Sequence, residues 1–456
     1  MTLADEVWAL LEEALAVYRD SPRAVAWLRG HQARFAEPVR VAVAGAPRAG
    51  KSTVANALIG EEFVPTGTFT WYRDGGRPRA SVGPHEVPIA RRDGRAFVDA
   101  GEADRVDVEW PSRSLRELTL IDTPAGAPVE QVYGEADAVL YLTRHVHSTD
   151  LRYLRTAHDH PVARAAPVNT VLVLARADEI GGGRIDALSS AKQIARRYRR
   201  EAQVKPLCQN VIAVAGLLAV AARTLRPDEF AALASLASLA RTELDDHLLS
   251  ADRFVGEDFP VRLDPAVRRG LVDRFGIFGV RLTTTLIRQG FDTQVRLTGQ
   301  LVQRSGLGEL RESIGAYFGE RQDVLKSRSA LLGLDVVLRN EPRPGSAGLA
   351  AGVERVLASA HDFRELRLLA ALQSGRATLP GELAGEATRL VGGLGTTVPA
   401  RLGVEYQPTD AELRQEVLET VGRWREQAAN PAYDQTQRRA AAVVVRSCEA
   451  MLVGLG

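Results

Sequence analysis

The sequence has few cysteines and almost no net charge, and both features restrict what the protein does. Only two of its 456 residues are cysteines, Cys208 and Cys448. A disulfide framework and a cysteine-rich metal site are therefore excluded, and a reducing compartment is expected. The 58 Lys and Arg residues nearly balance the 57 Asp and Glu residues, which leaves a formal net charge of +1. This balance points to no nucleic-acid partner and no polyanionic substrate.

Long apolar runs are also lacking. No run of 18 apolar residues occurs, so the sequence predicts no membrane-spanning helix, and any membrane contact is expected to be peripheral. The start, MTLADEVWALLEEAL, has acids inside its apolar stretch and no basic segment before it, which differs from a signal peptide. We therefore expect a cytoplasmic protein. A chain of 456 residues exceeds one compact core, so two or three domains are expected.

Short apolar segments alternate with helical patterns between residues 39 and 216. This alternation is typical of an α/β domain, in which a mostly parallel sheet carries helices on both faces. The expected strands cover residues 39–44, 118–121, 138–142, 170–174 and 211–214. The expected helices cover residues 51–59, 148–158 and 185–200.

Both ends of the chain show helical patterns without strands. Residues 3–29 are predicted to form one amphipathic helix, because apolar side chains recur at helical spacing. Beyond about Pro227 the strand pattern stops, and residues 306–339 predict a nearly continuous long helix. The sequence thus predicts an N-terminal helix at 1–36, an α/β domain at 37–226 and an elongated all-α bundle at 227–456.

The segment after the first expected strand, GAPRAGKS, fits the phosphate-binding pattern G-x-x-x-x-G-K-[ST] completely. The glycines let backbone N–H groups surround a phosphate, and the next helix adds the positive end of its dipole. Lys51 neutralises phosphate oxygens, and Ser52 offers a hydroxyl to Mg²⁺. The residues expected to contact the nucleotide here are Gly45, Ala46, Pro47, Arg48, Ala49, Gly50, Lys51, Ser52 and Thr53.

Two further segments are expected to sense the γ-phosphate. In LTLIDTPAG, Asp122 can hold Mg²⁺ through a water molecule, and Gly126 can offer its N–H to the γ-phosphate. The usual order places the glycine directly after the proline, whereas Ala125 intervenes here. The other segment, FVPTGTFTWYRDG, must supply a threonine to Mg²⁺. Thr66, Thr68 and Thr70 all remain candidates, and we assign Thr70 to the metal together with Ser52 and Asp122.

The segment LVLARADEI is the candidate for recognition of the base. Asp178 can accept hydrogen bonds from both N–H donors of guanine, and the planar head of Arg176 can stack on the ring. Gly216 ends VIAVAG, where the last base-contacting loop is expected. We therefore expect GTP or GDP with Mg²⁺ as cofactors. A P-loop ATPase remains the alternative, against which Asp178 argues.

Together these motifs resemble those of bacterial dynamin-like proteins. The resemblance rests on VAVAGAPRAGKSTVANALIG, IGEEFVPTG, LTLIDTPAG and ARADEI, followed by a long helical half. TWYRDG, RADEIGGGRIDAL and GLLAVAARTLR are more closely similar to the mycobacterial isoniazid-inducible type, the IniC type. This resemblance implies a GTPase head, a helical trunk, and a neck that combines the N-terminal helix with C-terminal helices. It further implies a homodimer through the GTPase domain, and GTP-dependent assembly, membrane-lipid binding and remodelling at the inner face of the plasma membrane.

The P-loop departs from that of eukaryotic dynamins, which carry Gln-Ser where this chain has Pro47-Arg48. Proline cannot orient the attacking water as that glutamine does. Guanylate-binding proteins and atlastins resemble this chain in having an arginine at the position of Arg48, where it acts as an arginine finger on dimerisation. Two interpretations of Arg48 remain. Either Arg48 takes part in catalysis together with Lys51 and Thr70, or it is an exposed loop arginine without a catalytic role. The departures also allow an alternative function, a weakly hydrolysing GTP-binding partner of a paralogous dynamin-like protein.

Several other features have two interpretations each. The stretches available for the two switches are short. Either the switches of this protein are shortened, or mobile segments are missing from the sequence. We favour the second interpretation. Residues 340–352 are either a lipid-binding tip loop or, as we favour, an ordinary loop between helices. The arginines at 196, 197, 199 and 200 favour a solvated helix face over a lipid site. His145, His147, His158 and His160 lack the spacing typical of a metal site.

Overall fold

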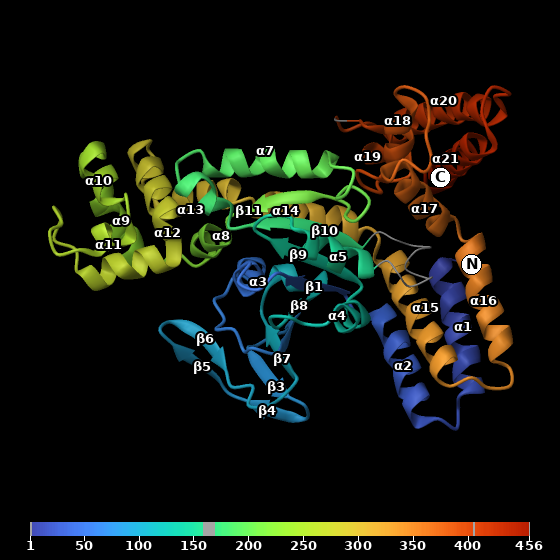
Figure 1. The fold of residues 1–456 in the computed structure, drawn as a ribbon, viewed down its shortest axis with the longest axis horizontal. Helices are drawn as coiled ribbons and strands as arrows, with labels where there is room; N and C mark the ends of the chain where they lie inside the picture. The colour runs from blue at the N-terminus through green and yellow to red at the C-terminus, as the bar shows by residue number, and fades with distance from the viewer. Residues whose placement is uncertain (1, 158–168, 405, 456) are drawn as a thin grey trace.

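The computed structural model describes residues 2–157, 169–404 and 406–455 (Figure 1). A central sheet separates two groups of helices along the long axis of the molecule. Helices from residues 227–304 lie at one end, and helices from both ends of the chain lie together at the other.

The described part of the sheet has nine strands in the order β11-β10-β9-β1-β8-β2-β7-β3-β4. Five of them are parallel to one another and confirm the five expected strands: β1 (Val39–Gly45), β8 (Leu118–Asp122), β9 (Ala138–Thr143), β10 (Thr170–Ala175) and β11 (Val211–Val214). An extension beyond β8 consists of β2 (Phe69–Asp74), β7 (Arg105–Trp110), β3 (Arg79–Val82) and β4 (His85–Val87). β2 runs antiparallel to β8, and a separate hairpin is formed by β5 (Ile89–Arg92) and β6 (Arg95–Val98).

Helices cover both faces of the sheet, as the continuous apolar strands predict. Along β1, Val39, Val41 and Val43 contribute to one core, while Ala42 and Ala44 contribute to the other. The first core packs against α3 (Lys51–Ile59) and α14 (Leu307–Ile314). On the second face lie α4 (Val129–Glu135), α5 (Ser148–Thr156) and α7 (Ala187–Arg200).

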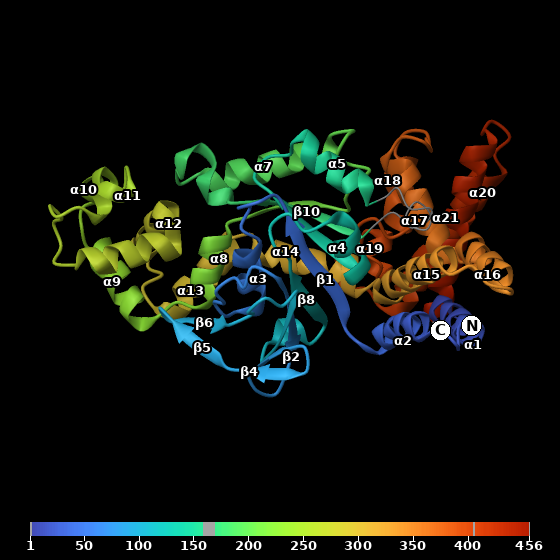
Figure 2. The same ribbon diagram turned by 60° about the horizontal axis from the view of Figure 1, so that its bottom comes forward.

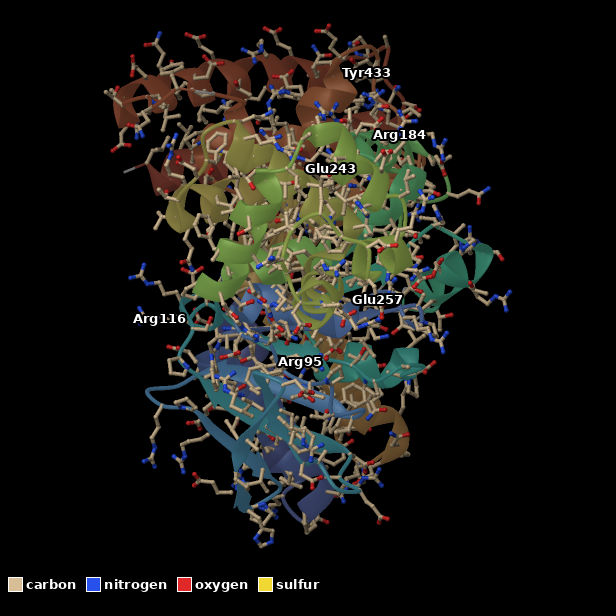
Figure 3. All side chains as sticks on the ribbon, turned by 90° about the vertical axis from the view of Figure 1, so that its left-hand side faces the viewer. Arg95, Arg116, Arg184, Glu243, Glu257 and Tyr433 are labelled. Carbon is tan, nitrogen blue, oxygen red and sulfur yellow. The ribbon has the colours of Figure 1, made fainter. Side chains whose placement is uncertain are left out.

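The second core continues beyond the sheet into a helical extension. α8 (Gly216–Arg223) follows β11 and leads into α9 (Pro227–Ala237), α10 (Arg241–His247), α11 (Ala251–Val255), α12 (Pro265–Arg288) and α13 (Gln294–Arg304). Phe254, Phe275 and Leu301 of this extension belong to the same buried cluster as the strand residue Tyr141. Figure 3 views this end, with Glu243 and Glu257 on the extension and Arg95 on the hairpin beneath it. The extension is therefore part of the α/β domain in packing terms.

The N-terminal segment forms two helices, α1 (Leu3–Val17) and α2 (Pro22–Ala36), where one helix over residues 3–29 was expected. That prediction was wrong because Ser21 and Pro22 are a strong helix start. The Ser21 hydroxyl accepts a hydrogen bond from the Ala24 N–H, and proline at the first helical position cannot continue a preceding helix.

These two helices pack against α15 (Gln322–Asn340) and α16 (Ser346–Ser359) to form a neck bundle. Figure 1 shows the bundle beside the sheet, with the labelled N-terminal end in it. Its core includes Leu11, Leu28, Leu331, Leu349 and Phe363. The apolar stripe of the N-terminal segment is thus buried by helices about 300 residues away in sequence.

The expected long helix over residues 306–339 is interrupted. α14 ends at Ile314, a π-helical turn spans Gly315–Gly319, and α15 begins at Gln322. Glycines at both ends of the turn lower the cost of leaving α-helical geometry, which the apolar pattern alone did not reveal. The break separates α14, which packs on the sheet, from α15 in the neck.

A second helical bundle, the trunk, completes the chain. It consists of α17 (His361–Gln373), α18 (Leu383–Leu390), α19 (Val398–Leu402), α20 (Asp410–Ala429) and α21 (Gln435–Gly454). Its core contains Leu369, Val417, Trp424 and Val444. Among the described residues no helix is long and apolar enough to cross a membrane.

Residues 341–345 connect α15 to α16 at the end of the neck. The Tyr18 hydroxyl donates a hydrogen bond of 2.8 Å to the Glu341 carbonyl, and Arg343 forms an ion pair with Asp20. This connection is thus tied to the turn between α1 and α2. Such contacts fit the favoured interpretation of an ordinary loop between helices.

Candidate nucleotide-binding site

The phosphate-binding loop joins the end of β1 to the start of α3. Its backbone takes left-handed conformations at Gly45 (φ 130°), Arg48 (φ 58°) and Gly50 (φ 93°). A Cβ atom at Gly45 would clash with the backbone carbonyl of Leu142 in β9. The Ala46 N–H donates to that same carbonyl at 3.1 Å, which fixes the loop against the neighbouring strand. Glycine at position 45 is therefore required for the close approach of two strands as well as for the turn.

Lys51 is the first residue of α3, and its side chain turns back over the loop. Its Nζ atom donates hydrogen bonds to the carbonyls of Gly45 (3.3 Å) and Ala46 (3.4 Å). Burial lowers the pKa of Lys51, while the negative charge of Asp122 acts in the opposite direction. The ammonium group thus lies where it can reach phosphate oxygens held by the loop.

Asp122 ends β8 directly beside the loop. The Ser52 hydroxyl hydrogen-bonds to its carboxylate, and the Oδ1 atom is buried without a hydrogen-bond partner among the described residues. Burial raises the pKa of Asp122 to about 6, against the effects of Ser52 and Lys51. A buried carboxylate with one unsatisfied oxygen beside a serine hydroxyl fits a hydrated Mg²⁺ ion, which prefers oxygen ligands. Elsewhere in the described chain, no group of three His, Cys, Asp or Glu residues could hold a metal ion.

Thr70 lies on β2 directly across from Asp122 in the antiparallel register. Its side chain is only 2% exposed, and its hydroxyl is 2.6 Å from the hydroxyl of Thr66. Thr66 and Thr68 are half-buried on the segment that leads into β2. The three candidate threonines therefore stay together near Asp122, and the assignment of Thr70 to the metal stays a prediction.

The second switch follows Asp122 without a break. The Thr123 hydroxyl donates to the Val43 carbonyl at 2.9 Å, which ties the start of the switch to β1. Gly126 is exposed with a φ of 76°, in a tight turn that α4 follows at Val129. A cavity of about 310 Å³ separates this turn from Gly45 and Pro47 of the phosphate loop. Residues 60–68 lie between α3 and β2, and residues 123–128 lie between β8 and α4, so both switches are short in this chain.

The candidate base-binding residues follow β10. Arg176 has a left-handed backbone (φ 55°), and its guanidinium bonds to Glu179. Asp178 is buried, and this burial raises its pKa. A small cavity of about 60 Å³ is lined by residues of the phosphate loop and of the base-binding candidates, among them Gly50, Thr53, Arg176, Asp178 and Gly216. The structure thus brings the phosphate loop and the base-binding candidates together at one edge of the sheet.

This edge is the carboxyl edge of the parallel strands. β1, β8, β9, β10 and β11 all point toward it, and β1 lies between β8 and β9. In open α/β sheets, ligands bind beyond the carboxyl ends of the strands, where the connections from a central strand leave toward opposite sides. The expected site residues occupy that place.

Sequence reasoning missed the contribution of helix α12 to this site. The helix breaks at Gly276 (φ 66°, ψ 168°), and the break lies beside Asp178 and Leu217. Arg281 of the same helix donates a hydrogen bond of 2.6 Å to the Gly183 carbonyl, behind the base-binding loop. A glycine inside a helical pattern was the available signal. Nothing local in the sequence connected that glycine to a loop about a hundred residues earlier.

The chain has relatives among curated proteins. The isoniazid-induced protein IniC of Mycobacterium tuberculosis, strain CDC 1551 / Oshkosh, is 36% identical over 487 residues, and the match covers 99% of each chain. The chain belongs to the IniC family. The IniC protein of strain H37Rv matches to the same extent. No family model matches the chain.

Other similarities to this IniC-family chain are shorter or weaker. The GTPase Der of Nitrobacter hamburgensis is 37% identical over 95 residues, which cover 21% of this chain and 19% of that protein. A solved structure described as "An oligomerised bacterial dynamin pair provides a mechanism for the long range sensing and tethering of membranes" covers 99% of this chain and 75% of its own. Its sequence identity is 11% and its TM-score 0.33, which is too low for a structural comparison.

Arg48 has an unusual position in this member of the IniC family. It is exposed, and it makes no hydrogen bond or ion pair with any residue that the structure describes. Left-handed backbone is uncommon for a residue with a Cβ atom and costs of order 1 kcal/mol. An unpaired arginine held at the tip of a phosphate loop is placed to contact phosphate or a second molecule.

His145 and His147 lie after β9 with ring centroids 6.4 Å apart. His158 and His160 lie outside the described residues. On α7, Arg199 donates a hydrogen bond of 3.0 Å to the Val211 carbonyl at the sheet edge, and Arg197 pairs with Glu201. These two arginines therefore have structural partners on the α/β domain.

Proposed function

We propose that this protein is a dynamin-like GTPase that binds and hydrolyses GTP with Mg²⁺. The proposal rests mainly on one observation: Lys51, Ser52 and Asp122 lie close together beside a complete phosphate loop. This set supplies a cation for the phosphates and two oxygen ligands for a metal. Bound Mg²⁺ would neutralise charge on the β- and γ-phosphates.

The protein's own residues then have separate roles. Lys51 holds the β- and γ-phosphate oxygens, and the N–H groups of the loop and of the first turn of α3 hold the rest. Thr70 and Gly126 belong to the two segments that face the γ-phosphate, on opposite sides of Asp122 in sequence. When a second GTPase domain binds, Arg48 contacts the phosphates, and its positive charge stabilises the negative charge of the transition state. We therefore propose a homodimer through the GTPase domain.

Guanine is the proposed base because of Asp178. Its carboxylate lines the same cavity as Gly50 and Thr53, so a nucleotide on the phosphate loop can place its base there. A carboxylate only accepts hydrogen bonds, and guanine offers two neighbouring N–H donors on one edge. Adenine offers no such pair, so the alternative of a P-loop ATPase is disfavoured.

The proposed function extends to self-assembly and to peripheral membrane binding and remodelling at the inner face of the plasma membrane. The support is membership of the IniC family and the dynamin-like sequence motifs, together with a neck and a trunk that are separate bundles beyond the GTPase domain. Lipid contact in this proposal is peripheral, since no described helix could span a membrane.

A second candidate function is a GTP-binding assembly partner of a paralogous dynamin-like protein, with weak hydrolysis of its own. Pro47 favours it, because the exposed side of the loop carries no glutamine to orient a water molecule. Steady-state turnover of the full chain distinguishes the two candidates. Slow turnover at every protein concentration, which rises only when the paralogue is added, would favour the second.

Equilibrium binding of GTP and ATP tests the nucleotide proposal directly. We expect GTP to bind at least about a hundredfold more tightly, because a site built around Asp178 leaves its carboxylate unpaired with adenine. Lys51→Ala should weaken GTP binding about ten- to a hundredfold, the contribution of charge-assisted hydrogen bonds. Lys205→Ala, at an exposed position, is the matched control. Equal affinity for GTP and ATP would exclude guanine recognition.

Co-sedimentation with anionic liposomes tests the membrane proposal. The full chain is compared without nucleotide, with GDP and with a non-hydrolysable GTP analogue. The proposal predicts more bound protein with the GTP analogue. Binding that is equal in all three states would leave a GTPase without nucleotide-controlled membrane binding.

A further inference from the structure

A cavity of about 250 Å³ lies between the GTPase domain and the neck. Helix α4 and the end of α5 form one wall, and helices α2 and α15 form the other (Figures 1 and 2). The apolar part of the described wall comes from Trp27, Val129, Tyr133, Leu332 and Val336. Trp27 and Val336 of this wall are 41% and 39% exposed, so both side chains lie partly in solvent.

Two neutral polar side chains in the wall are buried, and each leaves one polar atom without a hydrogen-bond partner in the described part of the chain. The Nδ1 atom of His31 and the Oγ atom of Ser329 have no hydrogen-bond partner among the described residues. Both residues line the cavity, and their exposed fractions are only 4% and 3%. A buried polar atom without a partner costs about 1–3 kcal/mol, so native proteins rarely keep two of them in the wall of one cavity. Such atoms call for a ligand or ordered water.

The charge of His31 restricts what this ligand can be. Burial is the main cause that lowers the pKa of His31 well below its usual value, and the positive charges of Arg34 and Arg40 add to it. The imidazole is therefore neutral at physiological pH and offers a hydrogen bond without a charge. The Ser329 hydroxyl is neutral as well. The Arg328 guanidinium also lines the cavity and stays charged at neutral pH, because burial lowers its pKa only to about 10, but it already has an interaction within the protein. A hydroxyl group on a ligand suits both, because it can donate and accept whichever tautomer His31 adopts.

We propose that this cavity is a binding site for a small, uncharged amphipathic molecule, with an aromatic or short aliphatic body and one hydroxyl or amide group. The body would lie against Trp27, Tyr133 and Leu332, and the polar group would bond to both His31 and Ser329. An engineered apolar cavity of about 150 Å³ is known to bind benzene. The larger volume here therefore accommodates a substituted ring.

The cavity lies at the junction between the GTPase domain and the neck, so a bound molecule would affect how the two are held together. α4 begins at Val129, three residues after Gly126 of the second switch, and α15 is a central helix of the neck. One occupant would contact both, and its binding free energy would add to the stability of the junction between domain and neck. The site is independent of the proposed GTPase activity, because the cavity includes no residue of the phosphate loop.

The test uses the full chain without nucleotide and two matched probes, 4-propylphenol and propylbenzene, which differ by one hydroxyl. Equilibrium dialysis measures their binding. We expect 4-propylphenol to bind with a dissociation constant at or below the millimolar range, and propylbenzene to bind up to about tenfold more weakly, the worth of one hydrogen bond. Ser329→Ala should reduce this preference for the phenol.

Gly134→Leu supplies the decisive variant. Gly134 is a helical residue of α4 that lines the cavity, and an added Cβ there meets no atom within 4 Å, so the position has room for a larger side chain. We expect it to abolish binding of both probes while the midpoint of thermal unfolding stays the same or rises. Gly30→Leu, on the exposed side of α2, is the matched control and should bind as the wild type does.

Three outcomes would overturn the proposal. They are no binding of 4-propylphenol to the wild type at millimolar concentration, unchanged binding to a folded Gly134→Leu variant, and tighter binding of propylbenzene than of the phenol. If Gly134→Leu fails to fold, Ser329→Ala decides the question, because removal of one buried hydroxyl from a cavity wall leaves the packing intact. An unchanged phenol preference in that variant would then contradict the assignment.

Discussion

The carboxylate of Asp178 lies against the break in helix α12 at Gly276. A Cβ atom on Gly276 would stand 3.8 Å from Asp178 Oδ2 and 3.9 Å from Leu217 Cδ1. The backbone angles of Gly276, φ 66° and ψ 168°, lie in a region that is essentially reserved for glycine. The proposed base-binding loop of the α/β domain thus lies against a distant helix whose path depends on one glycine.

Replacement of Gly276 by alanine should weaken guanine binding. Alanine disfavours these backbone angles by about 1–3 kcal/mol, so the break would shift and move the support of Asp178. We expect GTP and GDP affinity to fall about tenfold. Inorganic phosphate or pyrophosphate binding on the phosphate loop should change little, because α12 does not contact that loop's glycines.

Gly270→Ala is the control on the same helix. Gly270 has ordinary helical geometry, and an added Cβ meets no atom within 4 Å. Its replacement should raise stability slightly, by about 0.5–1 kcal/mol, and leave nucleotide affinity unchanged. Equal nucleotide affinities of the two variants would show that the break has no role in base binding.

Asp178→Asn should change the preferred base from guanine to xanthine. The asparagine amide can donate a hydrogen bond to the carbonyl that xanthine carries in place of the guanine amino group, whereas aspartate only accepts. We expect GTP affinity to fall and XTP affinity to rise, each about a hundredfold. Competition binding against a fluorescent nucleotide measures both. A variant that loses GTP without gaining XTP would place Asp178 in a structural role.

Arg48→Ala tests the proposed arginine finger. If Arg48 acts when two GTPase domains meet, the variant should turn over GTP as slowly as dilute wild type at every concentration. The wild type should accelerate with protein concentration, by up to about 10³-fold. Arg116→Ala, at the opposite edge of the sheet before β8, is the control. Equal rates of wild type and Arg48→Ala at all concentrations would make Arg48 a loop residue without a catalytic part.

His31 should make the protein acid-sensitive. In the folded protein the pKa of His31 lies well below 6.5, which is the value expected in the unfolded chain. Between these two pKa values the unfolded state is protonated at His31 and the folded state is not. This contribution leaves stability unaffected above pH 6.5. Below that value, stability falls by up to about 1.4 kcal/mol per pH unit until the folded pKa is reached.

The measurement is the apparent midpoint of thermal unfolding between pH 7.5 and 5. His31→Gln should show a smaller decrease with falling pH than the wild type, because its side chain does not titrate. His85→Gln, at an exposed position on β4, should follow the wild type. Parallel curves for all three proteins would mean that His31 is not the group that titrates on acid unfolding.

The parallel strands were predictable because each is buried on both faces, which gives a short, continuous apolar run. The extension from β2 to β4 was not predicted. Its strands carry exposed arginines such as Arg79, and their pairing depends on contact with β8 rather than on a local pattern. Ser21 and Pro22 were a local signal for a break in the N-terminal helix. The apolar periodicity on both sides of them led to the prediction of one continuous helix instead.

The sequence alone determined the chemistry of the phosphate loop, because Gly45, Gly50, Lys51 and Ser52 act through local backbone geometry within eight residues. It also placed Asp122 and Asp178 at strand ends, since parallel strands bring their carboxyl ends to one edge. Only the tertiary structure decided that Gly276 supports Asp178, and that α2, α4 and α15 enclose a cavity with His31 and Ser329 in its wall. Those contacts join segments about a hundred to three hundred residues apart, and no periodicity or motif records which distant surfaces pack together.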